Sequence, residues 1–222
     1  MRLPEVVVLL LLMVPVSGFA GTIRGTVRLP SVSSPNVSFQ PYAGRASSLA
    51  APARTQRGRV TDAVISIESL PAQVDAGLAN PTSSPRPRLS QSQQAFVPRV
   101  LAVPVGTTVD FPNLDAIYHN VFSVSPARRF DLGKYPRGDS RAVTFPKPGV
   151  INVYCDIHSD MAAFIVVLPN RAFTQPDEDG SFRLPELPAG RYTVRWWHPD
   201  FEGGTREVTV PSDGDATVDV EF

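Results

Sequence analysis

The apolar residues of this chain come in short runs broken by turn-forming residues, and nowhere do they keep a helical period over the length of an ordinary helix. Runs such as AVISIE (63–68), FIVVL (164–168) and RYTVRWW (191–197) alternate or stay apolar over the length of a strand. Proline, which cannot donate to a β ladder, is frequent at 23 of 222 residues, and Asp-Gly, Gly-Gly and Pro-Gly pairs separate the runs. The pattern predicts an all-β chain of many short strands joined by turns.

Two stretches, 31–58 and 71–94, have the small and polar composition of connections. Because they lack a sustained apolar period, the first predicts a flexible insertion and the second a linker, with a short strand near Leu89. The remaining strands are expected near 21–30, 60–70, 99–103, 107–111, 117–125, 141–145, 150–155 and 161–169, with a meander of strands from 177 to the C-terminus.

The first 20 residues predict export. Arg2 precedes an apolar run from Val6 to Val16, and small residues end at Ala20. The run is too short to span a bilayer, which takes about 20 residues, so we expect a signal peptide (1–20) cleaved after Ala20 and a periplasmic protein. An uncleaved anchor is the alternative. Lys and Arg balance Asp and Glu at 21 each, so we expect no nucleic-acid partner, and we expect no stable membrane insertion.

Cys155 is the only cysteine, so no internal disulfide is possible. A free thiol is a liability in an oxidising compartment unless it is buried or occupied. His158 and Met161 follow at equal steps of three, which in a tight turn brings side chains to the same side. His119, on an upstream strand, offers a fourth donor. Cys and two His with a weak Met form the blue-copper arrangement, so these four residues predict a site for one copper ion.

Blander interpretations exist for each residue. Cys155 and Met161 are also ordinary core side chains, and His119 is an acceptable strand residue. Zinc also binds Cys and His, and a Cys155–His158 pair is one arrangement of a nucleophilic enzyme. Neither alternative uses the methionine, so we expect no enzyme and no catalytic residues. His198, the third histidine, is expected to be structural and packed beside the two tryptophans.

Residues 96–168 resemble the cupredoxins, the Greek-key β-sandwich family of plastocyanin, azurin and amicyanin. The resemblance rests on VGTTVDFPNLD (105–115), on HN at 119–120 and on YC-x2-H-x2-M (154–161). The last motif has the amicyanin spacing, although Asp156 and Ile157 stand where amicyanin carries a proline.

The resemblance implies a type 1 (blue) copper site with His119, Cys155 and His158 as equatorial ligands and Met161 as the axial one. Asn120 would tie the two ligand loops together. The implied function is electron transfer, one electron at a time, between redox protein partners. The alternative is a copper-handling protein, a chaperone or store that uses the same site. Basic residues on one connection (Arg128, Arg129, Lys134 and Arg137) either steer an acidic redox partner or form a solvated loop.

DGSFRLPELPAGRYTVRWWHP (179–199) resembles the carboxypeptidase regulatory-like domain, a small transthyretin-type β-sandwich. RGTVRL (24–29) and DAVISIE (62–68) resemble its opening strands. We therefore expect opening strands at 21–70, a linker at 71–95, a cupredoxin domain at 96–168 inserted into the second sandwich, and a closing module at 169–222. Alternatively, the opening strands belong to the cupredoxin sheet. Chains of this pattern are often labelled methylamine-utilisation proteins, but no residue here indicates amine oxidation.

Overall fold

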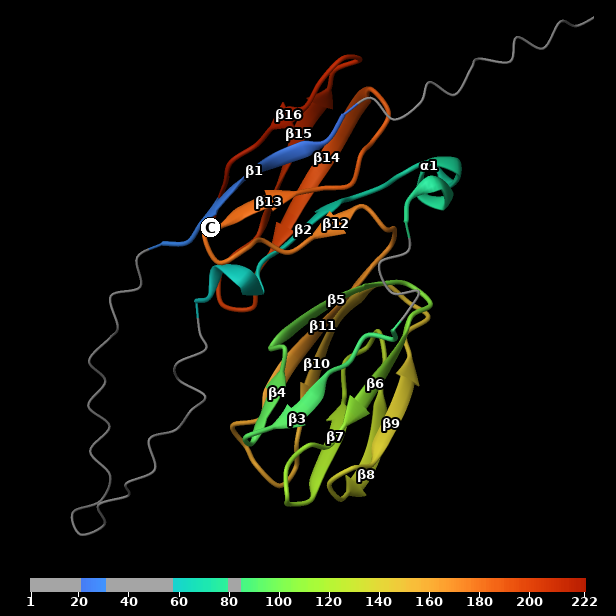
Figure 1. Ribbon diagram of the computed structural model, residues 1–222, viewed down its shortest axis with the longest axis vertical. Coiled ribbons are helices and arrows are strands. Elements are labelled where there is room, and N and C mark those ends of the chain that lie inside the picture. Colours follow the sequence, from blue (N-terminus) through green and yellow to red (C-terminus); the bar gives the residue numbers. More distant parts are fainter. Residues whose placement is uncertain (1–20, 31–57, 80–84) are drawn as a thin grey trace, which may run out of the picture.

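The computed structural model describes residues 21–30, 58–79 and 85–222 (Figure 1). The expected signal peptide and nearly all of the expected flexible insertion lie outside these residues. Within them the chain is almost entirely strand, which confirms the predicted all-β class. The strands form a central unit, β3–β11, and a terminal unit made of β1, β2, the short helix α1 and β12–β17. The helices found in the described part are short, and none is long and apolar enough to cross a membrane.

The central unit is a two-layer sandwich. One layer is a five-stranded sheet in the order β5-β11-β10-β7-β8, and the β6–β9 and β3–β4 pairs form the other. Alternate residues of β6 and β10 point inward, and with Leu89, Phe96 and Tyr135 they fill one core. The bounds are β3 (Ser90–Ser92), β4 (Ala95–Val97), β5 (Val100–Pro104), β6 (Thr108–Pro112), β7 (His119–Ser123), β8 (Phe130–Tyr135), β9 (Ser140–Thr144), β10 (Gly149–Tyr154) and β11 (Ala162–Leu168).

The terminal unit is built from both ends of the described chain. β1 pairs with β13, β16 and β17, and β2 pairs with β12 and β14, so strands that precede the central unit in sequence pair with strands that follow it. A separate apolar core lies between the two sheets. The bounds are β1 (Ile23–Arg28), η2 (Val60–Asp62), β2 (Val64–Ile67), α1 (Ala72–Gly77), β12 (Phe173–Thr174), β13 (Ser181–Arg183), β14 (Gly190–Trp197), β15 (Gly204–Val210), β16 (Ala216–Thr217) and β17 (Val220–Glu221).

The two units meet along an apolar seam with a buried ion cluster beside it. Val64, Val100, Val166 and Leu168 are buried there, and the rings of Phe164 and Trp197 lie 5.7 Å apart. This seam explains why β11 is apolar without alternation: Ala163, Ile165 and Val167 fill the central core, whereas Phe164, Val166 and Leu168 lie in the seam.

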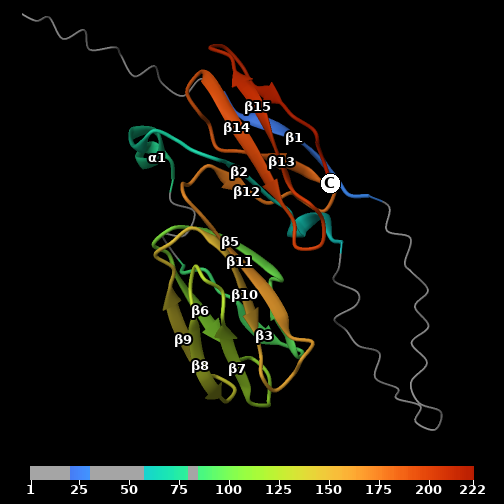
Figure 2. The ribbon, with the colours of Figure 1, turned by 180° about the vertical axis from the view of Figure 1, so that it is seen from behind.

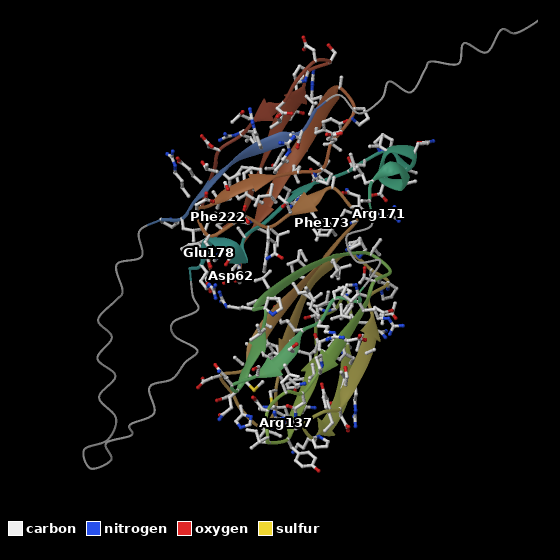
Figure 3. The ribbon with its side chains drawn as sticks, in the orientation of Figure 1. Asp62, Arg137, Arg171, Phe173, Glu178 and Phe222 are labelled. Carbon is white, nitrogen blue, oxygen red and sulfur yellow. The ribbon has the colours of Figure 1, made fainter. Side chains whose placement is uncertain are left out.

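Arg99, from the central unit, forms the ion cluster with two carboxylates of the terminal unit. Its guanidinium donates to Asp62 at 2.8 Å and to both carboxylate oxygens of Asp200 at 2.8 Å. The three side chains are only 12%, 7% and 20% exposed, in that order. Figure 3 shows Asp62 at the boundary between the units. Charges and apolar side chains together therefore join the two units.

Some segments are more ordered than the sequence predicted. The expected linker at 71–95 contains the unpredicted helix α1, and Leu78 and Leu89 are buried in the two cores; β3 is the short strand expected near Leu89. The basic connection at 130–136 is the strand β8, with Tyr135 fully buried. His198, expected to be structural and packed beside the two tryptophans, is buried, and its ring contacts those of Phe201 and Phe222.

Candidate metal centre

Three strands bring the predicted metal ligands to one end of the central unit. His119 begins β7, Cys155 directly follows β10, and Met161 directly precedes β11. The ladder between β10 and β11 extends to the pair Tyr154 and Ala162, so the loop 155–161 closes an antiparallel hairpin. Figures 1 and 2 agree that this loop lies at the end of the central unit remote from the terminal unit.

The loop is held by its own backbone. The N–H of Cys155 donates to the carbonyl of Met161 at 3.3 Å, and the N–H of Met161 donates to the carbonyl of His158 at 3.0 Å. Met161 is 1% exposed and belongs to the same buried cluster as Cys155. The predicted spacing of three thus corresponds to a compact turn that buries the thiol and the thioether on the same side.

His119, Cys155 and His158 form one cluster of donor atoms. The Nδ1 atoms of the two histidines lie 3.1 Å apart, and the sulfur of Cys155 lies 4.0 Å from Nδ1 of His119 and 3.9 Å from Nδ1 of His158. Bonds near 2.0 Å to nitrogen and 2.3 Å to sulfur place three donors at 120° roughly 3.5–3.7 Å apart. The observed separations bracket that range, so the three side chains fit a single metal ion with little movement.

The cluster is almost closed to solvent. His119 is 0% exposed and Cys155 5%, whereas His158 is only partly buried. The donor set includes a soft sulfur and two imidazoles, with a second sulfur buried alongside. Such a set suits copper in either oxidation state.

Asp115, which the sequence did not single out, contacts the cluster through His119. Its carboxylate accepts a hydrogen bond from Nε2 of His119 at 2.8 Å and from the backbone N–H groups of Gln93 and Gln94 at 2.6 and 2.8 Å. Burial by itself raises the pKa of Asp115, but the hydrogen bonds from Gln94, His119 and Gln93 outweigh it and lower the pKa below its usual range. A carboxylate that accepts from Nε2–H favours the tautomer of His119 in which Nδ1 is unprotonated. The lone pair of Nδ1 is then directed at the cluster.

Asn120, the expected tie between the ligand loops, is 2% exposed and contacts both loop and strand. Its side-chain oxygen accepts from the N–H of Asp156 at 3.3 Å, and its amide nitrogen donates to Asp131 at 2.7 Å. Asn120 therefore connects β7 to the loop that carries Cys155 and His158.

The rim of the site is apolar and of mixed charge. Four large apolar side chains on the two ligand loops are 41–58% exposed, namely Leu114, Ile117, Tyr118 and Ile157. Lys134, one of the expected basic residues, lies 3.7 Å from the carboxylate of Asp156, and Arg137 lies at the same end of the unit (Figure 3). Lys134 is therefore paired with an acidic residue of the ligand loop.

The chain is similar in parts to known proteins. Residues 162–222 match the family model of the carboxypeptidase regulatory-like domain. No curated protein sequence matches the chain significantly.

Three solved structures illustrate the structural similarities. A copper-containing nitrite reductase from Thermus scotoductus SA-01 is 32% identical over 36% of the chain, with a TM-score of 0.35. The chain spans only 22% of that protein. A purple cupredoxin from Nitrosopumilus maritimus is 25% identical over 36% of this chain and 98% of its own, with a TM-score of 0.33. A Cu(I) form of an amicyanin variant is 23% identical over 48% of this chain and 98% of its own, with a TM-score of 0.35.

Proposed function

We propose that this chain is a type 1 copper protein of the cupredoxin kind that carries single electrons between redox proteins of the periplasm. The observation that carries the proposal is the convergence of the two Nδ1 atoms and one thiol sulfur, 3.1–4.0 Å apart, with His119 and Cys155 buried and His158 partly buried. His119, Cys155 and His158 would hold the copper as equatorial ligands, and Met161 as the axial one.

Bound copper would supply a one-electron couple; the chain supplies a site that changes little when the electron moves. The closed loop 155–161 and the burial of Cys155 and Met161 support a rigid ligand set. Such a set binds both oxidation states with little rearrangement, which a carrier requires.

His158 is the natural point of contact with a redox partner. It is the most exposed of the three clustered donors, and Ile157 beside it is 41% exposed. An exposed apolar rim of this kind is typical of a surface that contacts a protein partner. Export through the N-terminal signal peptide is part of the same proposal, as is a central unit inserted into a regulatory-like module that positions or docks the protein.

The test is the visible and EPR spectrum of the purified full chain titrated with Cu(II). We expect an intense thiolate charge-transfer band and narrow copper hyperfine splitting. Cys155→Ser should abolish both, whereas Ser159→Ala, an exposed position in the same loop, should keep both. A colourless protein that binds only Cu(I) would favour copper handling instead. If the protein bound no copper, the proposal would be wrong.

A further inference from the structure

The carboxylate of Asp115 lies between the cluster and a hairpin turn that carries none of the donors. The turn joins β3 to β4 at Gln93 and Gln94, whose N–H groups both point at the carboxylate. The opposite side of the carboxylate meets Nε2 of His119. Three of its acceptor positions are thus used, two by the turn and one by the ligand.

The turn is unusual in its own right. Gln93 and Gln94 have φ values of 55° and 54°, the left-handed region that two-residue hairpin turns need and that Gly or Asn usually supplies. Residues other than Gly and Asn seldom adopt this backbone conformation unless their surroundings stabilise it. An anion that accepts both turn amides is such a surrounding, since consecutive N–H groups form a concave anion site.

The loop that carries Asp115 is fixed independently. The N–H of Asp115 donates to the side-chain oxygen of Asn113 at 3.0 Å, and the Asn113 amide donates to the carbonyls of Ile117 and Tyr135 at 2.9 and 3.0 Å. Asn113 is fully buried. The backbone of Asp115 is therefore held by its own loop and its carboxylate by the turn, so the side chain is oriented toward His119 in the absence of any ligand.

We propose that Asp115 is the positioning residue of the metal centre: it holds the proton of His119 on Nε2 and keeps Nδ1 directed at Cys155 and His158, while the β3–β4 turn fixes its carboxylate. The expected effect on copper binding rests on the proposed function. The hydrogen-bond relay, which runs from the turn amides through Asp115 to His119, does not. The 3.1 Å separation of the two Nδ1 atoms is a hydrogen-bond distance, and Asp115 makes His119 the acceptor in it.

The relay is tested first without copper, on the full chain labelled with ¹⁵N. Long-range ¹⁵N–¹H spectra should show His119 protonated at Nε2 only. The amides of Gln93 and Gln94, although their residues are exposed, should exchange slowly with solvent. A wild-type His119 protonated at Nδ1, or fast-exchanging turn amides, would overturn the proposal whether or not the protein binds copper.

The variants then test the consequence. Asp115→Asn keeps the shape but turns one oxygen into a donor that opposes the turn amides, and Asp115→Ala removes all three contacts. Asp139→Asn, on the exposed turn between β8 and β9, changes the same charge at the same end of the unit as a control. We expect Cu(I) affinity, measured by chelator competition, to fall 10- to 100-fold in the Asp115 variants, as is typical when a carboxylate behind a metal-bound histidine is lost.

Loss of the carboxylate should weaken the binding of Cu(II) more than that of Cu(I), because a nearby anion favours the more highly charged ion. Each tenfold difference raises the reduction potential by about 59 mV. If both Asp115 variants matched the Asp139→Asn control in His119 tautomer, copper affinity and potential, the positioning role would be refuted. If wild type bound no copper but kept the tautomer and the slow amides, only the proposed function would fail.

Discussion

The ion cluster between the two units gives the sharpest prediction on stability. Arg99→Met keeps an apolar stem at this position but removes the guanidinium, which lies between Asp62 and Asp200 and 5.7 Å from the centre of the Phe164 ring. At an effective dielectric constant of about 20, each 2.8 Å contact supplies roughly 6 kcal/mol of attraction, most of which offsets the desolvation of the charges. Removing the cation alone leaves two largely buried carboxylates side by side.

We therefore expect Arg99→Met to lower the free energy of unfolding by about 3–5 kcal/mol, the range for breaking a buried ion pair. Replacing all three members, with Asp62→Asn and Asp200→Asn added, should recover most of the loss because no uncompensated charge remains. Arg195→Met is the matched control: its partner Glu68 is exposed, as is Arg195 itself, so its loss should be below about 1 kcal/mol.

The assay is urea unfolding of the full chain followed by tryptophan fluorescence. Both tryptophans lie in β14, and Trp197 contacts the central unit, so the signal reports on the boundary. The reasoning would be refuted if Arg99→Met lost no more stability than Arg195→Met, or if the triple variant were less stable than Arg99→Met. Either result would mean that the apolar seam alone joins the units.

Three further predictions concern acid stability, the linker and the ligand loop. Burial raises the pKa of Asp200, but hydrogen bonds from Arg99 and from a backbone N–H lower it overall, below the usual 3.8. The ionised carboxylate therefore contributes stability in full above pH 3.8, and this stability is lost as the pH falls through the lower pKa of the folded state. Urea unfolding between pH 5 and 2 should therefore show a steeper acid loss in wild type than in Arg99→Met, and parallel curves would contradict this. Leu89→Ala should lower the free energy of unfolding by about 2–5 kcal/mol in the same assay because Leu89 is fully buried, whereas Val97→Ala, at a side chain 48% exposed, should lower it by about 0.5 kcal/mol or less. Equal losses would mean that Leu89 is not part of the packed core. Asn120→Ala removes two hydrogen bonds from a buried site and should cost about 1–3 kcal/mol and shift the visible copper band, and an unchanged band would show that the ligand loop does not need this tie.

Local sequence features were sufficient where the determining contacts are local or purely apolar. The run that became β11 was predicted to be a strand because it stays apolar over a strand's length, and its residues lie in two different buried clusters. The spacing from Cys155 to Met161 predicted a turn with both sulfurs on one side, and both are buried in one cluster. His119 needed more, because only the chemistry of the donor set connected it to a loop 36 residues away.

The features that the sequence did not reveal depend on distant partners. Asp115 is an ordinary acidic loop residue until it meets a turn more than 20 residues upstream, and Gln-Gln is not a typical pair for a two-residue hairpin turn. The helix α1 is too short to show a period, and Asp75 within it is fixed by the N–H of Arg171 at 2.7 Å. Local propensity carries no information on contacts across that many residues.

The position of the seam along β11 constrains what the terminal unit does. Met161 precedes this strand at the metal end, and the seam follows along the strand at Phe164, Val166 and Leu168. At about 3.3 Å per residue, these seam residues lie roughly 10 to 23 Å along the strand from Met161. Along this length the strand pairs with β10 on one side and with β5 on the other. The terminal unit therefore neither covers the cluster nor supplies any of its donors. We propose that its contribution is orientation: it is fixed to the central unit along the seam and away from the loop 155–161, so any surface that holds the terminal unit would also set the direction in which His158 and its apolar rim face.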